Sequence, residues 1–240
     1  MTIAAIATMP ERLHLLEKVI LSLRSQVDII QVYLNNFETI PTFLASEEAL
    51  LSRDALGDIG DAGKFFWFDK EEYDYYLTVD DDLLYPENYV STLIHEFEKR
   101  HKKAIIGVRG FVFFEPIESY VTSRSETYKG TRALDIARSV NVIGTGTAIL
   151  SSQTIRLSLK DFPKRNMVDL QLAISAQKQK VPMVVIARGE NWISELQDAV
   201  PSDGYSIWKE TKKDNGRIQA RVANSEIAKW QISPDPVKEL

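Results

Sequence analysis

The chain has 240 residues, enough for one large domain with a substantial core, and its 44% hydrophobic and 26% charged content is ordinary for a soluble globular protein. The net charge of −5 argues against a general nucleic-acid binder, which would carry a basic face, so no nucleic-acid partner is expected. The sequence has no cysteine, which excludes disulfides, thiolate metal sites and cysteine nucleophiles. That composition suits a reducing compartment, and a cytoplasmic location is expected.

Residues 2–8 form an apolar run that Pro10 interrupts, with no basic stretch before it. This pattern indicates a buried strand and not a signal peptide. No apolar stretch approaches the roughly 18 residues that a transmembrane helix needs, so any membrane contact is expected to be peripheral.

A helix is expected to begin at Pro10 with Thr8 as its cap. Its apolar positions recur at helical spacing: Leu13, Leu16, Val19, Ile20 and Leu23. A second strand is expected at 29–34, just before Asn35. This β-α-β opening predicts parallel strands in a right-handed unit, and residues 41–64 after it are less regular.

Three consecutive aspartates, Asp80, Asp81 and Asp82, follow the apolar run 75–79. The run predicts a buried strand, and aspartate is a poor strand former, so the carboxylates should lie at the carboxyl end of the strand. In open α/β sheets ligands bind at this edge. Because the three negative charges repel one another, the pattern favours a hard cation such as Mg²⁺ or Mn²⁺. A strand end followed by a solvated acidic loop is the alternative.

The rest of the chain predicts two helices and several short strands. The helices are expected at 86 to about 101 and at about 167–180, and the strands at 104–108, 111–114, 140–143, 148–150 and 183–186. Residues 115–138 have the composition of a surface loop or substrate rim. The polar segment after Pro201 has the composition of a partly mobile tail. With no repeat or linker, one α/β domain is expected.

Two clusters with ligand-binding chemistry are expected at the same sheet edge. The first strand-to-helix turn, with Arg12, either offers N–H groups and positive charge to an anion or is a capped helix with an exposed arginine. The glycine-rich run 57–65 contains Lys64, which either meets phosphate oxygens or sits in a flexible turn. The run is not a Walker A loop, since Asp58 and Phe65 stand where that motif needs Gly and Ser or Thr.

Two further clusters lie in the second half of the chain. Asp169, near the start of a helix that Asn166 is expected to cap, is either a helix-terminus carboxylate or a general base at the rim of a cleft. The Gly-Thr-Gly-Thr sequence at 144–147 either bonds to sugar hydroxyls or turns a corner. The histidines do not have the spacing of metal ligands: His14, His95 and His101.

Taken together, these motifs resemble the glycosyltransferases of the GT-A fold, especially the family 2-like enzymes of bacteria and large DNA viruses. The resemblance covers roughly residues 2–195, and its main motif is the aspartate triplet followed by Leu-Leu-Tyr-Pro. It implies a single Rossmann-like α/β domain at 1–200, with a mostly parallel central sheet flanked by helices. Its nucleotide-binding half would span about 1–110 and its acceptor half about 111–200, followed by a tail at 201–240.

The resemblance also implies a reaction, the transfer of a sugar from a UDP-linked donor to a hydroxyl of a glycan or glycolipid acceptor, assisted by Mn²⁺ or Mg²⁺. The residues implied to contact the donor are Ala7, Thr8, Arg12, Asn35, Asp61, Lys64, Asp80 and Asp81. On the acceptor side it implies Gly146 and Thr147, and it makes Asp169 the base of an inverting reaction. Asp82 and Asp80 would hold the metal.

One departure from the family pattern concerns the metal. Many GT-A enzymes add a late histidine as a ligand, and this chain has none after His101. Either Glu190 replaces it, or the ion relies on Asp82, the diphosphate and water.

Two other functions stay open at this point. One is a non-catalytic module that binds carbohydrate or nucleotide sugar. The other is a metal-dependent phosphotransferase or nucleotidyltransferase. Phosphatases with an aspartate nucleophile carry a Thr or Val where this chain has Leu84, and nucleotidyltransferases carry a Gly-rich, Arg-bearing first loop where it has residues 7–10. Turnover of a nucleotide sugar separates the transferase from the module.

Overall fold

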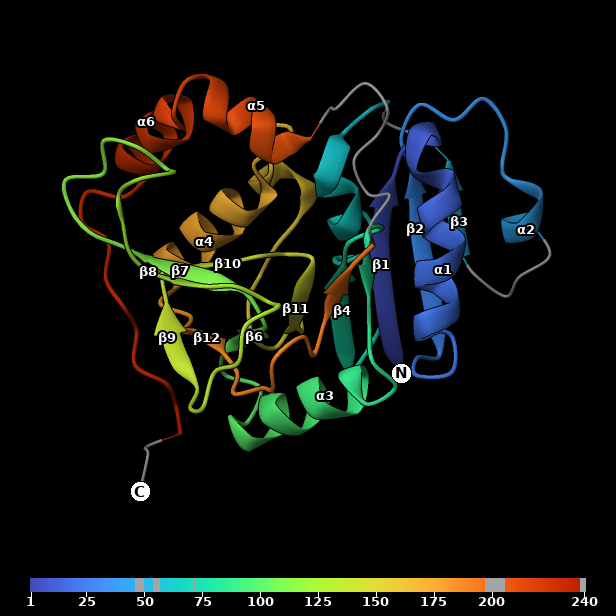
Figure 1. Cartoon of the computed structure of the whole chain (residues 1–240), viewed down its shortest axis with the longest axis horizontal. Helices are drawn as coiled ribbons and strands as arrows, with labels where there is room; N and C mark the ends of the chain where they lie inside the picture. Colours follow the sequence, from blue (N-terminus) through green and yellow to red (C-terminus); the bar gives the residue numbers. More distant parts are fainter. Residues whose placement is uncertain (46–49, 54–56, 71, 197–205, 238–240) are drawn as a thin grey trace.

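The computed structural model describes residues 1–45, 50–53, 57–70, 72–196 and 206–237 (Figure 1). In the first half the elements are β1 (Thr2–Thr8), η1 (Pro10–Arg12), α1 (Leu13–Leu23), β2 (Ile29–Leu34), α2 (Thr42–Ala45), β3 (Leu50–Arg53), η2 (Gly60–Phe65), β4 (Tyr75–Val79), β5 (Leu83–Leu84), α3 (Tyr89–Lys99), β6 (Ile105–Gly107) and β7 (Gly110–Phe113). In the second half they are β8 (Arg124–Tyr128), β9 (Arg138–Val140), β10 (Val142–Ile143), β11 (Thr147–Leu150), η3 (Leu159–Asp161), α4 (Val168–Gln179), β12 (Met183–Val185), β13 (Ser194–Glu195), α5 (Ile207–Lys213) and α6 (Arg217–Glu226).

The central sheet has eight strands in the order β3-β2-β1-β4-β11-β6-β12-β9. Strands β3, β2, β1 and β4 run parallel, β11 lies antiparallel between β4 and β6, β12 is parallel to β6, and β9 is antiparallel to β12. The predicted mostly parallel sheet is therefore confirmed. Because β1, β2, β4 and β6 point the same way, their carboxyl ends and the start of β11 meet at one edge of the sheet.

Both faces of the sheet are covered, which is why β1 reads as a continuous apolar run instead of an alternating one. Ile3 and Ala5 of this strand belong to the core on one face, and Ala4 and Ile6 to the core on the other. The second core takes its helical side chains from α1, α2 and α3, and the first takes them from η2, α4 and α6. The apolar stripe predicted for the first helix is buried in this way, apart from Leu13, which is half-buried.

Three local predictions need correction. The first helix starts as the short helix η1 and has no side-chain cap, so Thr8 is not its cap. Helix α3 begins at Tyr89, three residues after the expected Pro86, because residues 86–88 form a turn. The expected surface loop 115–138 contains β8, which pairs antiparallel with β7. Its side chains are mostly exposed, so the strand lacks the apolar alternation that would have identified it.

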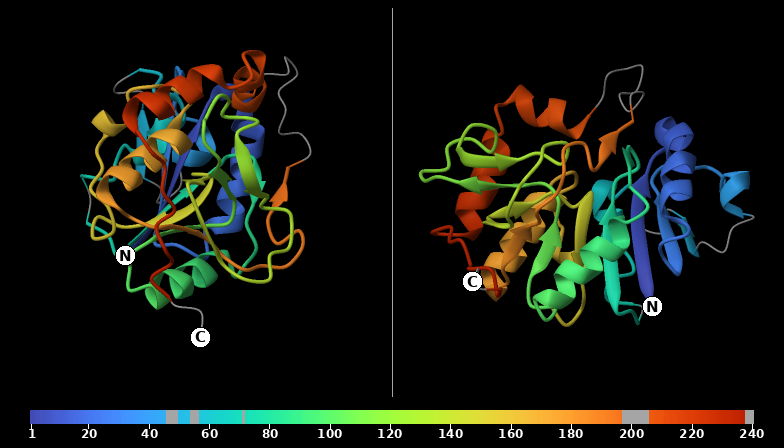
Figure 2. Two further views of the ribbon diagram at one scale, coloured as in Figure 1. Left: turned by 90° about the vertical axis from the view of Figure 1, so that its left-hand side faces the viewer. Right: turned by 60° about the horizontal axis from the view of Figure 1, so that its bottom comes forward.

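The described part of the expected tail is folded onto the domain. Ala220 and Ala223 of α6, and Trp230 beyond it, are buried in the same core as α4. Arg100, at the end of α3, donates to Asp235 with Nη2–Oδ2 at 2.6 Å, which fixes the segment that runs from α6 toward α3 (Figure 2). Residues 201–205 lie outside the described ranges, and the division into two halves stays a prediction.

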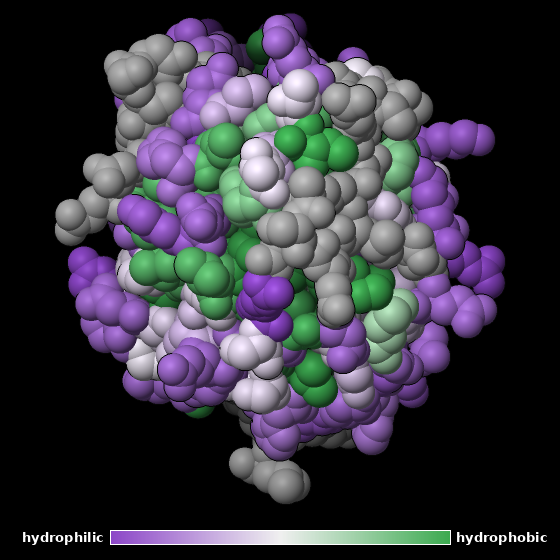
Figure 3. Space-filling model, turned by 90° about the vertical axis from the view of Figure 1, so that its right-hand side faces the viewer, coloured by the Kyte–Doolittle hydropathy of each residue, from purple (hydrophilic) through white to green (hydrophobic). Residues whose placement is uncertain are grey.

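The outer faces add two observations. No helix in the described ranges has the length and apolar character needed to span a bilayer. On the side of the molecule where α1 and α2 lie, hydrophobic side chains show in several places among hydrophilic ones (Figure 3).

Candidate active site

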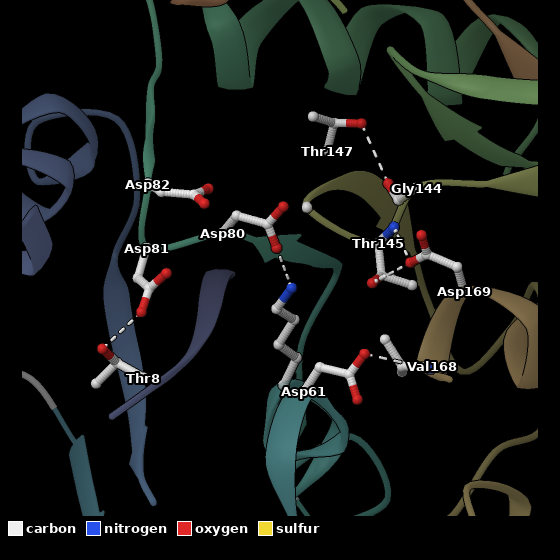
Figure 4. Close-up of polar contacts among 12 residues, drawn as sticks. Thr8, Asp61, Asp80, Asp81, Asp82, Gly144, Thr145, Thr147, Val168 and Asp169 are labelled. Carbon is white, nitrogen blue, oxygen red and sulfur yellow. Dashed lines mark hydrogen bonds and ion pairs between the residues drawn. The ribbon is translucent and has the colours of Figure 1, made fainter. Parts of the chain in front are cut away.

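The centre of the site is Asp80, the first residue after β4 (Figure 4). Lys64 of η2 pairs with one of its carboxylate oxygens, and Arg109, which follows β6, pairs with the other. The Lys64 side chain is only 5% exposed, whereas that of Arg109 is 37% exposed. Burial alone would raise the pKa of Asp80, but Lys64 and Arg109 outweigh it and hold this pKa below its usual range.

Asp81 and Asp82 share a different cation. Arg12 donates through Nη1 to Asp81 Oδ1 at 2.9 Å and to Asp82 Oδ2 at 2.8 Å. The other Asp81 oxygen accepts from the Thr8 hydroxyl at 2.7 Å, so Thr8 binds the buried carboxylate and does not cap the helix. Burial raises the pKa of Asp81 to about 6, against the opposing effect of Arg12. Arg12 and Thr8 thus join the end of β1 to the end of β4.

Asn35, at the end of β2, positions the glycine-rich run. Its Oδ1 accepts from the N–H groups of Ile59 at 3.1 Å and Gly60 at 3.0 Å, and its Nδ2 donates to the Gly60 carbonyl at 3.1 Å. Gly60 has φ +62, a left-handed conformation, and a Cβ there would lie 2.5 Å from Asn166 Oδ1. These contacts hold η2, and with it Lys64, at the ligand edge.

Asp61, also in η2, is a buried carboxylate with an unused oxygen. Its Oδ2 accepts from the N–H of Val168 at 3.3 Å, at the start of α4. Its Oδ1 has no hydrogen-bond partner among the described residues. Burial raises the pKa of Asp61 to about 7, and the attraction of Lys64 opposes this effect. A buried acceptor without a partner is costly; a ligand N–H would satisfy it, and a proton on the carboxyl would remove its charge.

Asp169 lies at the start of α4, and it does not cap its own helix. The cap position is Met167, without a side-chain hydrogen bond, and the expected cap Asn166 has φ +58. Asp169 Oδ1 accepts from the backbone N–H of Thr145 at 2.8 Å and from its hydroxyl at 2.6 Å. No described residue donates a hydrogen bond to Oδ2. One oxygen is therefore anchored, and the other is left for a ligand.

The Gly-Thr-Gly-Thr loop lies against the Asp80–Arg109 pair, and its two glycines explain how. A Cβ added to Gly146 would lie 1.9 Å from Asp80 Oδ2, and one added to Gly144 would lie 2.3 Å from Arg109 Nε. Tyr85 ties the loop to the triplet, since its hydroxyl accepts from the Asp80 N–H at 2.8 Å and donates to the Gly146 carbonyl at 2.7 Å. The loop thus brings Asp169, through Thr145, to the aspartate cluster.

The remaining expected residues are placed as follows. Ala7 is half-buried at the end of β1. The Thr147 hydroxyl accepts from the Val108 N–H and donates to the Gly144 carbonyl, both at 3.2 Å, so it is used inside the protein. Glu190 accepts from the Ala133 N–H at 2.7 Å and pairs with Arg132, apart from the aspartate cluster. Ligand contacts of Ala7, Gly146 and Thr147 stay predictions.

Sequence reasoning missed Arg109. The signal is available, because this arginine directly follows the run 104–108, which the sequence predicts to be a strand. The rule that identified Asp80, namely that the residue after a parallel strand lies at the ligand edge, applies equally here. Tyr85 was also missed, since its two contacts join residues far apart in the sequence.

The expected divalent cation is not required by the charges of the triplet. Three carboxylates, Asp80, Asp81 and Asp82, are matched by three cations of the chain: Arg12, Lys64 and Arg109. Within the described ranges, no three His, Cys, Asp or Glu side chains converge as a metal site. Asp82 is the most accessible of the three, with a side chain 26% exposed. Among the described residues, side chains alone therefore do not complete a site for Mg²⁺ or Mn²⁺, and ligand oxygens would have to do so.

Comparison with known proteins gives structural neighbours only. No family model matches the chain, and no curated protein matches its sequence. Residues 1–349 of Staphylococcus aureus TarS, in complex with UDP-GlcNAc, align with a TM-score of 0.51 and 10% identity over 79% of this chain and 57% of that chain. Another structure of TarS aligns with a TM-score of 0.52 and 12% identity over 92% of this chain.

The chain spans 41% of that TarS chain and 61% of a third TarS structure, which aligns with a TM-score of 0.52 and 12% identity over 82% of this chain. At such low identity the likeness concerns the fold alone. TarS is a GT-A-type glycosyltransferase. The chain described here shares the fold of these TarS structures, with a mostly parallel central sheet flanked by helices.

Proposed function

We propose that this protein is a glycosyltransferase that moves a sugar from a nucleoside diphosphate donor to a hydroxyl of a glycan or glycolipid acceptor. The observation that carries the proposal is the pairing of two features at one sheet edge. One is the cluster around Asp80, in which cations of the chain offset the three carboxylates. The other is a carboxylate, Asp169, with one anchored oxygen and one oxygen that no described residue contacts by a hydrogen bond. The first suits a diphosphate, and the second suits a hydroxyl that must lose its proton.

On the donor side, the diphosphate gains negative charge as the bond between the sugar's anomeric carbon and the phosphate oxygen breaks. Arg109 is the cation with the most exposed side chain, so it is the one best placed to meet phosphate oxygens. Lys64 supplies fixed positive charge behind it. Charges preorganised in this way stabilise the leaving group without reorganisation during the reaction.

On the acceptor side, the free Oδ2 of Asp169 takes the proton of the attacking hydroxyl. The hydroxyl oxygen forms the new bond to the anomeric carbon while the diphosphate departs from the opposite face. Base and leaving group on opposite faces give inversion, by the logic that governs inverting glycosidases. Thr145 holds the carboxylate in place through two hydrogen bonds to its other oxygen.

The nucleoside is proposed to be uridine, in a hexosyl donor such as UDP-GlcNAc, because the neighbour TarS holds that molecule and the sequence motifs resemble enzymes of that kind. Asp61 is proposed to accept a hydrogen bond from the base through its unpartnered Oδ1. A cytoplasmic setting is part of the same proposal.

The divalent cation is kept as a separate proposal. Mg²⁺ or Mn²⁺ would bind Asp82, with Asp80 as a second ligand, and donor phosphates and water would complete the shell. Bound there, the ion would add positive charge at the departing diphosphate. The test is calorimetric titration of UDP with Mn²⁺ and with EDTA. Weaker binding in EDTA, and no such difference in Asp82→Ala, are expected. Equal affinity with and without metal in the parent would remove the metal role.

The transferase itself is tested by incubating the protein with UDP-sugars and following UDP release. Slow hydrolysis of the donor without an acceptor is expected, because water takes the place of the acceptor hydroxyl. Binding of UDP-sugar without any turnover would favour a non-catalytic module. Phosphoryl or nucleotidyl transfer without release of UDP would favour the other enzyme classes.

A further inference from the structure

Arg124 is a cation outside the aspartate cluster, and aromatic rings surround it. The guanidinium carbon of Arg124, on β8, lies 3.8 Å from the ring centre of Phe111, 5.0 Å from that of Tyr120 and 5.2 Å from that of Trp208. Lys212 adds a further positive charge, with its amine 5.0 Å from the Trp208 ring centre. Three rings, from β7, α5 and the loop before β8, thus surround one guanidinium group.

No carboxylate in the described ranges neutralises the charge of Arg124. Its Nε donates to the Tyr120 carbonyl at 2.7 Å, and no carboxylate in the described part of the chain forms an ion pair with it. Arg12 and Arg109, in contrast, both bond to aspartates. Burial lowers the pKa of Arg124, which is the expected sign for a partly buried cation without an anion. No described residue accepts a hydrogen bond from either Nη group, so both can meet an external acceptor.

The cluster lies next to the proposed base. Phe111 is two residues beyond Arg109 on β7, and β7 pairs with β10, which leads directly into the Gly-Thr-Gly-Thr loop that holds Asp169. Asp169 contributes to the charge environment of both Arg124 and Tyr120. Helix α5, which carries Trp208, lies at the end of the molecule toward which β1 runs (Figure 1).

Trp208 gives the cluster an open aromatic face, since this residue is 43% exposed. An exposed indole provides a flat apolar surface for the C–H face of a sugar ring, and arginine held by aromatic rings presents its N–H edge to an anion in a bidentate way. Neutral sugar alone would leave the guanidinium charge uncompensated.

We propose that Arg124 and Trp208 form an acceptor subsite for a saccharide that carries an anionic substituent, either a phosphate or a carboxylate. Trp208 stacks on the sugar ring, Arg124 binds the anion, and the neighbouring hydroxyl is presented to Asp169. This assignment of the acceptor class rests on the proposed glycosyltransferase function.

The experiment uses the full chain with saturating UDP, so that the donor site is filled before the acceptor probe is added. UDP binding is measured first by calorimetry and reports on the proposed function by itself. Glucose, glucose 6-phosphate and glucuronic acid are then titrated and followed by saturation-transfer NMR. We expect both anionic sugars to bind at least about tenfold more tightly than glucose, as one charged hydrogen-bonding group contributes.

Two variants locate the binding. Arg124→Gln is expected to remove the preference for the anionic sugars, and Trp208→Ala to weaken all three sugars, while both keep the parental affinity for UDP. Trp208 is exposed, so its replacement leaves the fold intact even if Arg124→Gln does not fold. The matched control is Arg132→Ala, an exposed arginine paired with Glu190, which should change nothing.

Several results would overturn the subsite. They are equal affinity for glucose and glucose 6-phosphate in the parent, an unchanged preference in folded Arg124→Gln, and unchanged sugar binding in Trp208→Ala. If the parent protein does not bind UDP, the result instead counts against the glycosyltransferase function. Equal affinity for the phosphate and the carboxylate sugars supports a general anion site, and a preference for one of them identifies the substituent.

Discussion

The two sides of the candidate site handle charge in opposite ways. Around Asp80 every carboxylate of the triplet has a cation from the chain, and the ion pairs involve groups that are largely buried. Around Asp169 the charges are left open, with one unused carboxylate oxygen and, beyond it, Arg124 held by aromatic rings. A compensated cluster keeps its geometry before the donor arrives. Uncompensated groups gain most from a ligand, because the ligand supplies the missing partner.

The largest effect is expected at the open side, from Asp169→Asn. The amide keeps the oxygen that accepts from Thr145, so the loop and helix should stay in place, but it cannot take a proton. Sugar transfer, or donor hydrolysis, should fall by roughly 100- to 10,000-fold, while the affinity for UDP is unchanged. Rates and calorimetry measure the two quantities, and the exposed Asp135→Asn serves as control. A folded variant that turns over at the parental rate would exclude this base.

Substitutions on the compensated side should mainly lower the free energy of unfolding. Asp80→Asn leaves the buried Lys64 amine without its carboxylate, and breaking such a pair lowers the free energy of unfolding by about 3–5 kcal/mol. Urea denaturation gives this value. The double variant Asp80→Asn with Lys64→Met should recover much of the loss, because it removes the stranded charge. If the single variant is as stable as the parent, the ion pair does not contribute as described.

The junction between the two sides is tested by Gly146→Ala. The added Cβ would lie 1.9 Å from Asp80 Oδ2 and 2.7 Å from Arg109 Nη2, so the ion pair must shift. We expect a loss of about 1–3 kcal/mol in stability, together with weaker UDP binding. Gly189→Ala is the matched control, since nothing lies within 4 Å of its added Cβ. If the two variants have the same stability and the same affinity for UDP, the loop does not pack against the Asp80–Arg109 ion pair.

The last test concerns pH and distinguishes Asp61 from Asp80. Because the pKa of Asp61 is raised by burial to about 7, the folded protein binds this proton more tightly than the unfolded chain. Stability from Asp61 should therefore fall as pH rises from about 4 to about 7, by at most about 1.4 kcal/mol per pH unit. Asp80, with a lowered pKa, acts in the opposite sense and only below about pH 4.

Denaturation at several pH values checks this, with Asp61→Asn compared against Asp135→Asn. The first variant should have a flatter pH profile between 4 and 7, although Asp81, whose pKa is raised to about 6, keeps part of the slope. Identical profiles for both variants would mean that Asp61 is not protonated in the folded state in this range.

The comparison also shows where prediction from the sequence stopped. The ends of β1, β2 and β4 were predicted closely, and with them Thr8, Asn35 and Asp80 at one edge. The open side was predicted less well. The sequence predicts a loop where β8 forms and a tail where α5 forms, since β8 is mostly exposed and the segment after Pro201 is polar in overall composition. Arg124 and Trp208 are therefore not among the predicted site residues.

What the sequence determined by itself is the set of elements whose side chains repeat locally, together with the rule that ligands bind at the carboxyl edge of a parallel sheet. Only the tertiary structure decided which charges meet. Thr8 and Asp81 are 73 residues apart, Arg109 and Asp80 are 29 apart, and Thr145 and Asp169 are 24 apart. Such pairs leave no local pattern, because each forms only after distant strands and loops have packed together. For that reason the sequence alone does not predict that the chain's own cations neutralise the triplet.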